Sequence, residues 1–314
     1  MAELKLFSGN TNPEFAKKVA DCAGIELGHC KFGRFADGEV QIEIHESVRG
    51  ANTFVIQSGC PNVNESYMEL FLILDALRRA SAREISAVLP YYGYARQDRK
   101  VAPRAPISAK CIADLLKTAG ADRLISVDLH SSQIQGFFDG PVDHLFAIPT
   151  FAREWREKIG TGDEYVAVSP DAGGVERVRA FAKRIGCSIA IIDKRRAGPN
   201  QIESVNLVGD VRGKSAIILD DMIDTAGTLT QAVDSLLKNG AKRVFAVATH
   251  PVLSGPAVSR LKASGVEKVW VTDTIPLRAD AIASGKFEVV SVAPVVAEAI
   301  KRINEYDSVS ALFD

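Results

Sequence analysis

The chain has 314 residues, which predicts two domains at roughly 150 residues per domain. Hydrophobic residues make up 46% of it and charged residues 25%, a composition that is typical of globular proteins and excludes a wholly disordered chain. Lysine and arginine together number 38 and aspartate and glutamate 39, so the chain has no overall positive charge to hold nucleic acid by its phosphates.

The sequence carries no signal for a membrane or a secreted location. No stretch approaches the roughly 18 consecutive apolar residues of a membrane-spanning helix, and residues 1–15 lack the apolar core of a signal peptide. The five cysteines form no C-x-x-C pair, and an odd number fits a disulfide framework poorly. We therefore expect a cytoplasmic protein that has neither nucleic acid nor a membrane as a partner.

A short sequence pattern recurs along the chain and indicates the fold class. Residues 79–91, 118–130, 238–250 and 263–275 each contain a turn of small residues or glycine, a charged pair and an apolar run. A glycine after a helix is a common cap, and a short β-branched run that follows it is typical of a buried strand. Helix, cap and strand in repeated order predict an α/β fold with mainly parallel sheets flanked by helices.

The predicted elements follow from this pattern in chain order. Strands are predicted at residues 53–57, 85–89, 124–127, 165–168, 188–192, 216–219, 244–248 and 269–271. Helices are predicted at residues 67–80, 108–118 and 228–238. A crossover near residues 146–150 divides the chain into two expected domains, residues 1–146 and 147–314.

The segment 215–238 carries the strongest chemical signal. An apolar strand runs directly into Asp220 and Asp221, and the loop at residues 224–228, with the sequence DTAGT, then opens a helix. Small residues at a helix N-terminus suit an anion such as phosphate, and paired carboxylates suit vicinal hydroxyls or Mg²⁺. We interpret the segment as a sugar-phosphate site, because an ordinary capped turn does not account for the two preceding acids.

Four further loops follow predicted strands and contain candidate binding residues. The loop at 169–174 has Asp171 and two glycines, although a plain tight turn explains it nearly as well. The charged run at 96–100 resembles a solvated loop, but tyrosines adjoin it. His130 taken alone is more often structural than a ligand. Residues 193–200 carry three cations and a Gly-Pro pair, which suits either a basic surface loop or a mobile loop that closes on anions.

Several segments match one known family nearly end to end, from residues 6–10 to residues 308–314. They are FADGE (35–39), ESVRG (46–50), YARQDRK (94–100), RAPISAK (104–110), VDLHSSQIQGFFDGPVDHL (127–145), DKRR (193–196) and DDMIDTAGT (220–228). With these segments the chain resembles the ribose-phosphate diphosphokinases (phosphoribosyl pyrophosphate synthetases) of the phosphate-dependent class. The resemblance implies two tandem type I phosphoribosyltransferase-like domains. The first would carry the ATP and regulatory elements, and the second the ribose 5-phosphate cradle and the mobile catalytic loop.

The resemblance also implies a reaction. The β,γ-diphosphoryl group of ATP moves as one unit to the 1-hydroxyl of ribose 5-phosphate, giving AMP and 5-phosphoribosyl 1-diphosphate for nucleotide biosynthesis. Mg²⁺ is the implied cofactor, and inorganic phosphate the implied activator. Because the nucleophile is a substrate hydroxyl, the protein needs no Ser-His or Cys-His pair and acts by positioning and charge neutralisation.

Roles for individual residues follow from the same resemblance. Stabilisation of the transition state falls to Lys194 and Arg196. The ribose 5-phosphate site comprises Arg196, Asp220, Asp221, Asp224, Thr225, Ala226, Gly227 and Thr228. The ATP site comprises Arg96, Gln97 and His130 together with Phe35, Asp37 and Glu39 from a neighbouring subunit. The metal-associated pair is His130 and Asp171.

A regulatory site is also implied, for activating phosphate or inhibiting ADP. It involves Ser47, Arg49, Ser81, Ser308 and Ser310. An ATP site shared between subunits requires a homo-oligomer, and the family implies a hexamer. The sequence departs from the family in the mobile loop, where Ala197-Gly198-Pro199 replaces a segment that carries another arginine in many members. We expect activity to survive this departure, because Lys194 and Arg196 are present.

Two other functions remain open at this stage. A phosphoribosyltransferase would use the same DDMIDTAGT segment but would lack an ATP apparatus, which FADGE, RQDRK and the KRR loop argue against. A catalytically inactive regulatory homologue would be expected to lose loop cations or cradle residues, and this chain keeps them.

Overall fold

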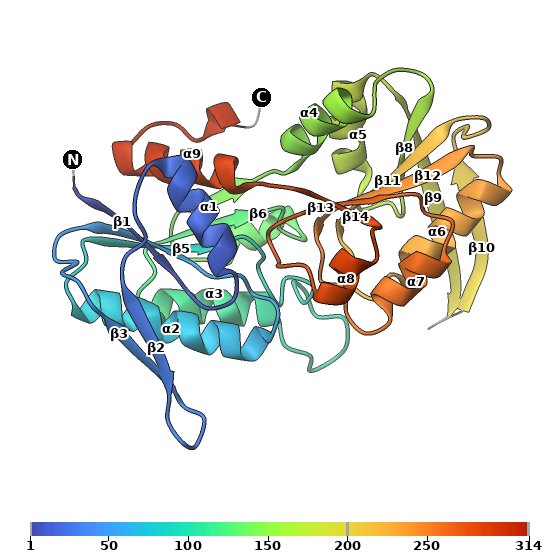
Figure 1. The fold of residues 1–314 in the computed structure, drawn as a ribbon. Helices are drawn as coiled ribbons and strands as arrows, with labels where there is room; N and C mark the ends of the chain where they lie inside the picture. The colour runs from blue at the N-terminus through green and yellow to red at the C-terminus, as the bar shows by residue number, and fades with distance from the viewer. Residues whose placement is uncertain (1, 199–200, 313–314) are drawn as a thin grey trace. The chain divides into compact units, whose positions relative to one another are not determined.

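The computed structural model describes residues 2–198 and 201–312, and the side chains of these residues outside 193–205. The chain divides into two compact units, which are drawn as a ribbon in Figure 1. The first unit consists of Met1–Phe146, Thr274–Pro276 and Val292–Asp314, and the second of Ala147–Asp273 and Leu277–Ser291.

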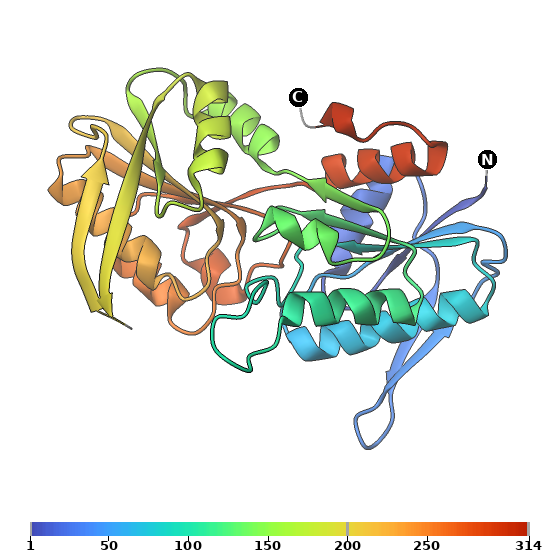
Figure 2. The same cartoon turned by 180° about the vertical axis from the view of Figure 1, so that it is seen from behind.

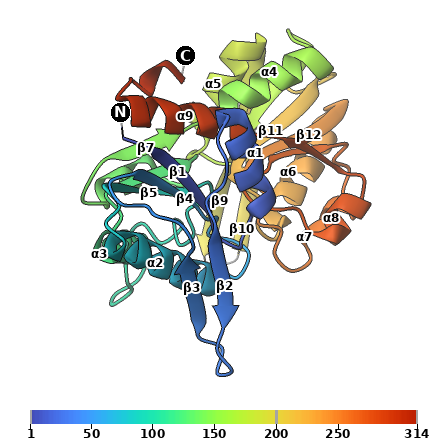
Figure 3. The same ribbon diagram turned by 60° about the vertical axis from the view of Figure 1, so that its left-hand side comes forward.

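The extent of the units differs from the expected domains at the C-terminal end. The chain passes into the second unit after Phe146. Residues 292–314, however, group with the first unit, because helix α9 (Ala293–Glu305) packs against helix α1 (Pro13–Ala23) (Figure 3). The expected domain 147–314 is therefore longer than the second unit.

The first unit is built on a five-stranded parallel sheet with the strand order β1-β4-β5-β6-β7. The strands are β1 (Leu4–Ser8), β4 (Asn52–Ile56), β5 (Glu84–Leu89), β6 (Arg123–Val127) and β7 (Val142–Leu145). Helices α2 (Val63–Arg79) and α3 (Ser108–Ala119) cover one face of this sheet, and α1 and α9 cover the other (Figure 1). An antiparallel hairpin of β2 (Cys30–Arg34) and β3 (Val40–Ile44) projects from the unit, and the short 3₁₀ helices are η1 (Ser132–Gly136) and η2 (Ser310–Leu312).

Helix α1 forms where the sequence gives clear start and stop signals. The Asn12 side chain accepts a hydrogen bond from the Phe15 N–H at 3.3 Å, and a proline occupies the first helical position. The helix ends at Gly24, whose φ of 72° is a left-handed cap. Phe15, Ala16, Val19 and Ala20 are its buried residues, so it presents one apolar face.

The second unit is built on a seven-stranded sheet with the order β10-β9-β8-β11-β12-β13-β14. All neighbours are parallel except β9 and β10. The strands are β8 (Tyr165–Ser169), β9 (Ser188–Gly198), β10 (Gln201–Val208), β11 (Ser215–Met222), β12 (Arg243–His250), β13 (Val269–Thr272) and β14 (Phe287–Val290). Helices α4 (Ile148–Lys158) and α5 (Val175–Ile185) lie on one face, and α6 (Gly227–Lys238), α7 (Ala257–Ala263) and α8 (Ala279–Ala283) on the other (Figure 1).

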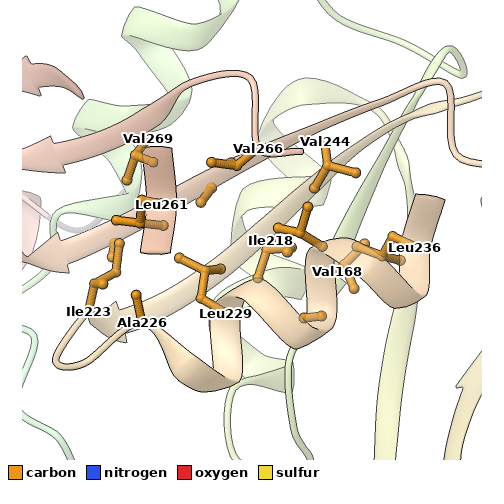
Figure 4. Close-up of a cluster of buried hydrophobic side chains, with 14 of the residues drawn as sticks. Val168, Ile218, Ile223, Ala226, Leu229, Leu236, Val244, Leu261, Val266 and Val269 are labelled. Atoms are coloured by element: carbon orange, nitrogen blue, oxygen red, sulfur yellow. The ribbon is translucent and has the colours of Figure 1, made fainter. Parts of the chain in front are cut away.

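Two different cores hold this sheet to its helices. Under α4, the fully buried Trp155 meets Phe245 and Phe181 edge-on, with ring centroids 5.2 and 6.1 Å away. Under α6 and α7 the core is aliphatic and includes Ile218 and Leu229 (Figure 4). This aliphatic core includes Ile223 and Ala226 of the loop that leads into α6, and it therefore fixes the position of the candidate site.

The α/β fold class predicted from the sequence is confirmed. Every predicted strand and each of the three predicted helices is present, with ends that shift by a few residues. The elements that the pattern missed include β1, β7 and β14, which have only four or five residues each, and helix α8 of five residues. None of the helices in the described ranges has the length and hydropathy that crossing a bilayer requires.

Candidate active site

A tight loop joins β11 to α6 and contains the residues predicted to bind phosphate. Ala226 adopts a left-handed backbone conformation, with φ 60° and ψ 7°, directly before Gly227 begins the helix. This conformation costs a residue with a Cβ atom about 1–2 kcal/mol. The methyl group of Ala226 packs in the same buried cluster as Ile223 and Leu229, and this burial holds the strained backbone in place (Figure 4).

The backbone carbonyl groups of residues 223–226 all accept hydrogen bonds. Their donors, in chain order, are the N–H of Leu253 (2.8 Å), the N–H of Ser254 (3.0 Å), Arg260 Nη1 (2.9 Å) and the N–H of Thr230 (3.0 Å). Across the described ranges, the backbone N–H groups of residues 225–228 have no hydrogen-bond acceptor. These donors, with the positive end of the α6 dipole behind them, can therefore bind an anion. We call residues 224–228 the cradle.

Asp220 and Asp221 lie close to the carboxyl end of β11, just before the cradle. The Asp221 N–H donates to Asp220 Oδ1 at 2.9 Å. Burial is the main cause that raises the pKa of Asp220 from its ordinary value of 3.8 to about 8. The adjacent Asp221 carboxylate raises it further, and the guanidinium of Arg177 opposes the shift. Such a pair can both accept and donate hydrogen bonds, which suits the vicinal hydroxyls of a sugar.

The Asp171 loop starts from the same edge of the sheet. Strand β8 pairs in parallel with β11, and the register sets Val168 beside Ile218. Asp171 Oδ1 accepts hydrogen bonds from the N–H groups of Gly173 at 2.9 Å and Gly174 at 3.1 Å. These bonds orient the exposed carboxylate, and its second oxygen makes no hydrogen bond within the part of the chain described.

Strand β9 carries the predicted catalytic cations beyond this edge. It pairs with β8 up to the Ser169–Ile191 register and then continues to Gly198, where β10 returns antiparallel (Figure 2). The backbone of Lys194 and Arg196 therefore extends from the strand next to the Asp171 loop. The side chains of Lys194 and Arg196 lie outside the described residues, so their roles stay predictions.

In the first unit, the FADGE residues form the tip of the β2–β3 hairpin. The Phe35 N–H donates to the Glu39 carbonyl at 2.9 Å, and the Glu39 N–H donates to Asp37 Oδ1 at 3.1 Å. These bonds give the turn a defined shape. The Phe35 ring is 53% exposed, so it can stack on a flat aromatic group.

Arg96, Gln97 and His130 follow two neighbouring strands of the first sheet. Strands β5 and β6 are parallel and adjacent, so the loops after them begin at one edge, where α/β proteins bind ligands. All three side chains are exposed. Gln97 Oε1 accepts a hydrogen bond from the Ser108 hydroxyl, and the Gln97 carbonyl accepts one from the Ala109 N–H at 3.2 Å. The start of α3 therefore positions Gln97.

The first turn of α2 contacts both predicted ATP segments of this chain. Glu65 forms an ion pair with Arg34 at the end of β2. Asn64 accepts a hydrogen bond from the Tyr94 hydroxyl, in a loop where Tyr94 has a left-handed φ of 64°. Tyr67 reaches the same loop through a 3.1 Å hydrogen bond to the Gly93 carbonyl.

Four of the five predicted regulatory residues form two hydrogen-bonded pairs. Arg49 Nη1 donates to the Ser81 hydroxyl at 3.2 Å, and the Ser310 N–H donates to the Ser308 hydroxyl at 3.3 Å. Within the described ranges, Ser47 makes no hydrogen bond to either pair. A cavity of about 520 Å³ in the first unit is lined by Ser310 and by polar residues that include Arg123, Gln135, Asp143 and His144.

The described residues contain no group of three or more His, Cys, Asp or Glu side chains that could hold a metal ion alone. His130 belongs to the first unit and Asp171 to the second. A divalent ion at either residue would need oxygen ligands from a substrate or from water, which is usual for Mg²⁺ on phosphates.

Four residues that the sequence analysis did not select contact the candidate site residues or influence them. Arg260 donates to the cradle, Ser108 to Gln97, Glu65 pairs beside the hairpin, and Arg177 acts on Asp220. Ser108 lies within RAPISAK (104–110), so the sequence carried a signal for it although no role was assigned. Glu65, Arg177 and Arg260 lie on helices outside the segments that carry the resemblance, and only tertiary structure relates them to the site.

Comparison with known proteins gives consistent matches over the whole chain. Residues 4–120 match the family described as the N-terminal domain of ribose phosphate pyrophosphokinase, and residues 195–314 the phosphoribosyl synthetase-associated domain. The ribose-phosphate pyrophosphokinase of Fusobacterium nucleatum is 53% identical over 99% of this chain and 98% of its own length. That of Bacillus subtilis is 54% identical over 99% of this chain and 97% of its own.

A solved structure agrees with these sequence matches. The crystal structure of phosphoribosylpyrophosphate synthetase from Mycobacterium smegmatis superposes with a TM-score of 0.91 at 45% identity. The match covers 97% of this chain and 99% of the mycobacterial one. The resemblance read from the sequence is thereby confirmed, and the chain belongs to the ribose-phosphate pyrophosphokinase family.

Proposed function

We propose that this chain transfers the β,γ-diphosphoryl group of ATP to the 1-hydroxyl of ribose 5-phosphate. The sugar oxygen attacks the β-phosphorus, the bond from that phosphorus to the bridging α,β-oxygen breaks, and the hydroxyl proton is released. The products are AMP and 5-phosphoribosyl 1-diphosphate. The observation that carries the proposal is the cradle, whose N–H donors lie directly after paired carboxylates in a chain more than half identical to named ribose-phosphate pyrophosphokinases.

The second unit supplies the sugar-phosphate site. Residues 224–228 bind the 5-phosphate through backbone N–H groups and the hydroxyls of Thr225 and Thr228. Asp220 and Asp221 bind the ribose hydroxyls. Lys194 and Arg196 neutralise the charge that develops on the transferred group, and Arg196 also contacts ribose 5-phosphate.

The first unit supplies the nucleotide site. Arg96, Gln97 and His130 bind the nucleotide of their own subunit. Phe35, Asp37 and Glu39 reach the nucleotide of a neighbouring subunit, where the exposed Phe35 ring stacks on the adenine. This sharing requires a homo-oligomer, for which we propose a hexamer in the cytoplasm.

Mg²⁺ is the cofactor that the site would take. The second oxygen of Asp171 suits a hard cation, because the N–H groups of Gly173 and Gly174 occupy only the first. His130 is the other residue that the family resemblance assigns to the metal. When bound, Mg²⁺ neutralises charge on the phosphates of ATP.

Regulation involves Ser47, Arg49, Ser81, Ser308 and Ser310, which respond to activating inorganic phosphate and inhibiting ADP. The Arg49 guanidinium beside the Ser81 hydroxyl has the chemistry to hold a phosphate group. Ser310 lines a cavity whose walls combine polar residues, Arg123 among them, with apolar ones.

A ³¹P NMR time course tests the reaction. The protein is mixed with ATP, Mg²⁺, inorganic phosphate and ribose 5-phosphate, beside a control without the sugar. We expect sugar-dependent AMP and a new diphosphate signal coupled to the sugar C1. ADP in place of AMP would mean transfer of a single phosphoryl group and would overturn the proposal. Intact ATP with folded protein would favour a regulatory homologue, and consumption of added 5-phosphoribosyl 1-diphosphate with a free base would favour a phosphoribosyltransferase.

A further inference from the structure

Arg260 contacts the cradle from the neighbouring helix α7. Its Nη1 atom donates to the Thr225 carbonyl at 2.9 Å. A Cβ atom placed on Gly227 would lie 3.5 Å from the same nitrogen, so the guanidinium sits beside the first residue of α6. The Arg260 side chain is exposed, and a bound anion can therefore approach it.

The hydrogen bond from Arg260 orients a peptide group of the cradle. In a trans peptide the C=O and the N–H point in opposite directions. Because Arg260 holds the Thr225 carbonyl on the α7 side, the Ala226 N–H of the same peptide points away from α7. The left-handed Ala226 then brings consecutive N–H groups to one concave side, which is the geometry of an anion-binding nest.

Charge gives Arg260 a second effect on the same loop. Asp221 lies just before the cradle and Asp224 within it, and negative charge on these acids repels a phosphate group. Arg278, also near this region, is paired with Asp280 at 2.6 Å. Arg260 forms no ion pair with any carboxylate in the described ranges, so its full positive charge is available to the loop.

We propose that Arg260 is a positioning residue for the 5-phosphate of ribose 5-phosphate, acting through the Thr225–Ala226 peptide and through its uncompensated charge. The inference rests on the proposed function and adds a residue outside the DTAGT motif to the same site. It makes the affinity for the phosphorylated sugar depend on helix α7.

The test compares Arg260→Met, which removes charge and donor, with Arg260→Lys, which keeps both. Lysine should suffice because only one N–H of the guanidinium is used. Lys262→Gln is the matched control, since it removes one exposed cation from the same helix. Arg260→Met should raise the KM and the Kd for ribose 5-phosphate about tenfold or more, the usual effect of losing a charged hydrogen bond. The KM for ATP should change less than about twofold.

The lysine variant and the control should stay within about threefold of the parent protein, and the salt dependence of kcat/KM should flatten only in Arg260→Met. Unchanged sugar binding in Arg260→Met would overturn the inference, as would an equal rise in the KM for ATP. Calorimetric binding of ribose 5-phosphate needs no turnover. A parent protein that binds the sugar but makes no AMP would therefore contradict the proposed reaction and leave the role of Arg260 measurable. If Arg260→Met fails to fold, Arg260→Leu, which also removes charge and donor, replaces it with the same criteria.

Discussion

Arg34 at the end of β2 forms an ion pair with Glu65 in the first turn of α2, and Arg34 Nη1 also donates to the Gly38 carbonyl at 3.2 Å. The pair therefore fixes the hairpin tip that carries Phe35 to a helix of the main body. Asn64, which precedes Glu65, accepts a hydrogen bond from the hydroxyl of Tyr94, in the loop that leads to Arg96. One helical turn thus connects two segments that we assign to nucleotide binding.

Breaking this ion pair should affect ATP more than stability. Both side chains are substantially exposed, at 53% and 39%, so Glu65→Gln should lower the free energy of unfolding by less than about 1 kcal/mol. The KM for ATP should rise severalfold, because the hairpin loses its fixed orientation. Glu267→Gln, which breaks the comparably exposed pair with Arg243, is the control. Equal ATP kinetics in both variants would contradict the assignment of the hairpin.

Replacing Lys194, which lies on strand β9 where the sequence predicted a mobile loop, should separate catalysis from binding. Lys194→Ala should lower kcat by a factor of about 100 or more and leave the KM for ribose 5-phosphate largely unchanged, because the cation acts on charge that forms in the transition state. Steady-state kinetics with both substrates measures the two parameters. Lys183→Ala, at an exposed position on α5, should leave both unchanged. A normal kcat in Lys194→Ala would remove this residue from the mechanism.

The cradle carboxylate should show the opposite kinetic signature. Asp224→Asn keeps the size of the side chain but changes its charge and its hydrogen bonding at the start of the loop. We expect a KM for ribose 5-phosphate raised about tenfold, because the changed hydrogen bonding of the loop outweighs the weaker repulsion of the phosphate, with a smaller effect on the KM for ATP. Saturation curves for each substrate test this expectation. An unchanged KM for the sugar would count against the sugar-phosphate assignment of residues 224–228.

The raised pKa of Asp220 predicts a pH-dependent stability. Between its ordinary pKa of 3.8 and its folded value of about 8, the folded protein retains a proton that the unfolded chain has released. The free energy of unfolding of the substrate-free protein therefore falls as pH rises through this window. Asp220→Asn removes that dependence, so its stability relative to the parent should increase from pH 5 to pH 9. Denaturant unfolding at these pH values measures it, and parallel curves for the two proteins would contradict the prediction.

Gly9 is required by close packing after β1. A Cβ atom at this position would lie 2.5 Å from Gln57 Cδ. Gln57 cannot move away freely, because it is buried and donates to Glu69 Oε1 at 2.8 Å. Gly9→Ala should therefore destabilise the protein by about 1–3 kcal/mol. Gly136→Ala, where a Cβ would meet open space, should cost much less in the same thermal or denaturant measurement. Equal stability of the two variants would contradict the packing argument.

Local pattern was enough to predict the fold class, because the predicted strands are short apolar runs bounded by turns. Residues 216–219 illustrate this, since their apolar side chains are buried in β11 between two parallel neighbours. The extent of the second unit could not be predicted from local sequence pattern. Helix α9 is amphipathic like its neighbours, and nothing in its own sequence says that its apolar face belongs on α1.

In the candidate site too, contiguous motifs could be predicted from the sequence, whereas features that depend on tertiary packing could not. The DTAGT loop and its two preceding acids form a contiguous motif, so their place at a strand end was predictable from the sequence. The left-handed Ala226 was not, since alanine has no local preference for that conformation. Arg260 lies 35 positions from Thr225, and only the packing of α7 beside α6 brings them together.

The return of helix α9 to the first unit has a consequence for how the protein is made on the ribosome. A chain emerges from its N-terminus, and domains usually fold in that order. Here helix α1 packs against helix α9, which lies some 270 positions later in the chain and is therefore synthesised much later. All strands of the second unit are translated before α9, so its sheet can form first. The first unit lacks one of its helices until α9 is translated. Chains that terminate after residue 291 should therefore expose the apolar face of α1, and cellular proteases and chaperones would recognise them as unfinished.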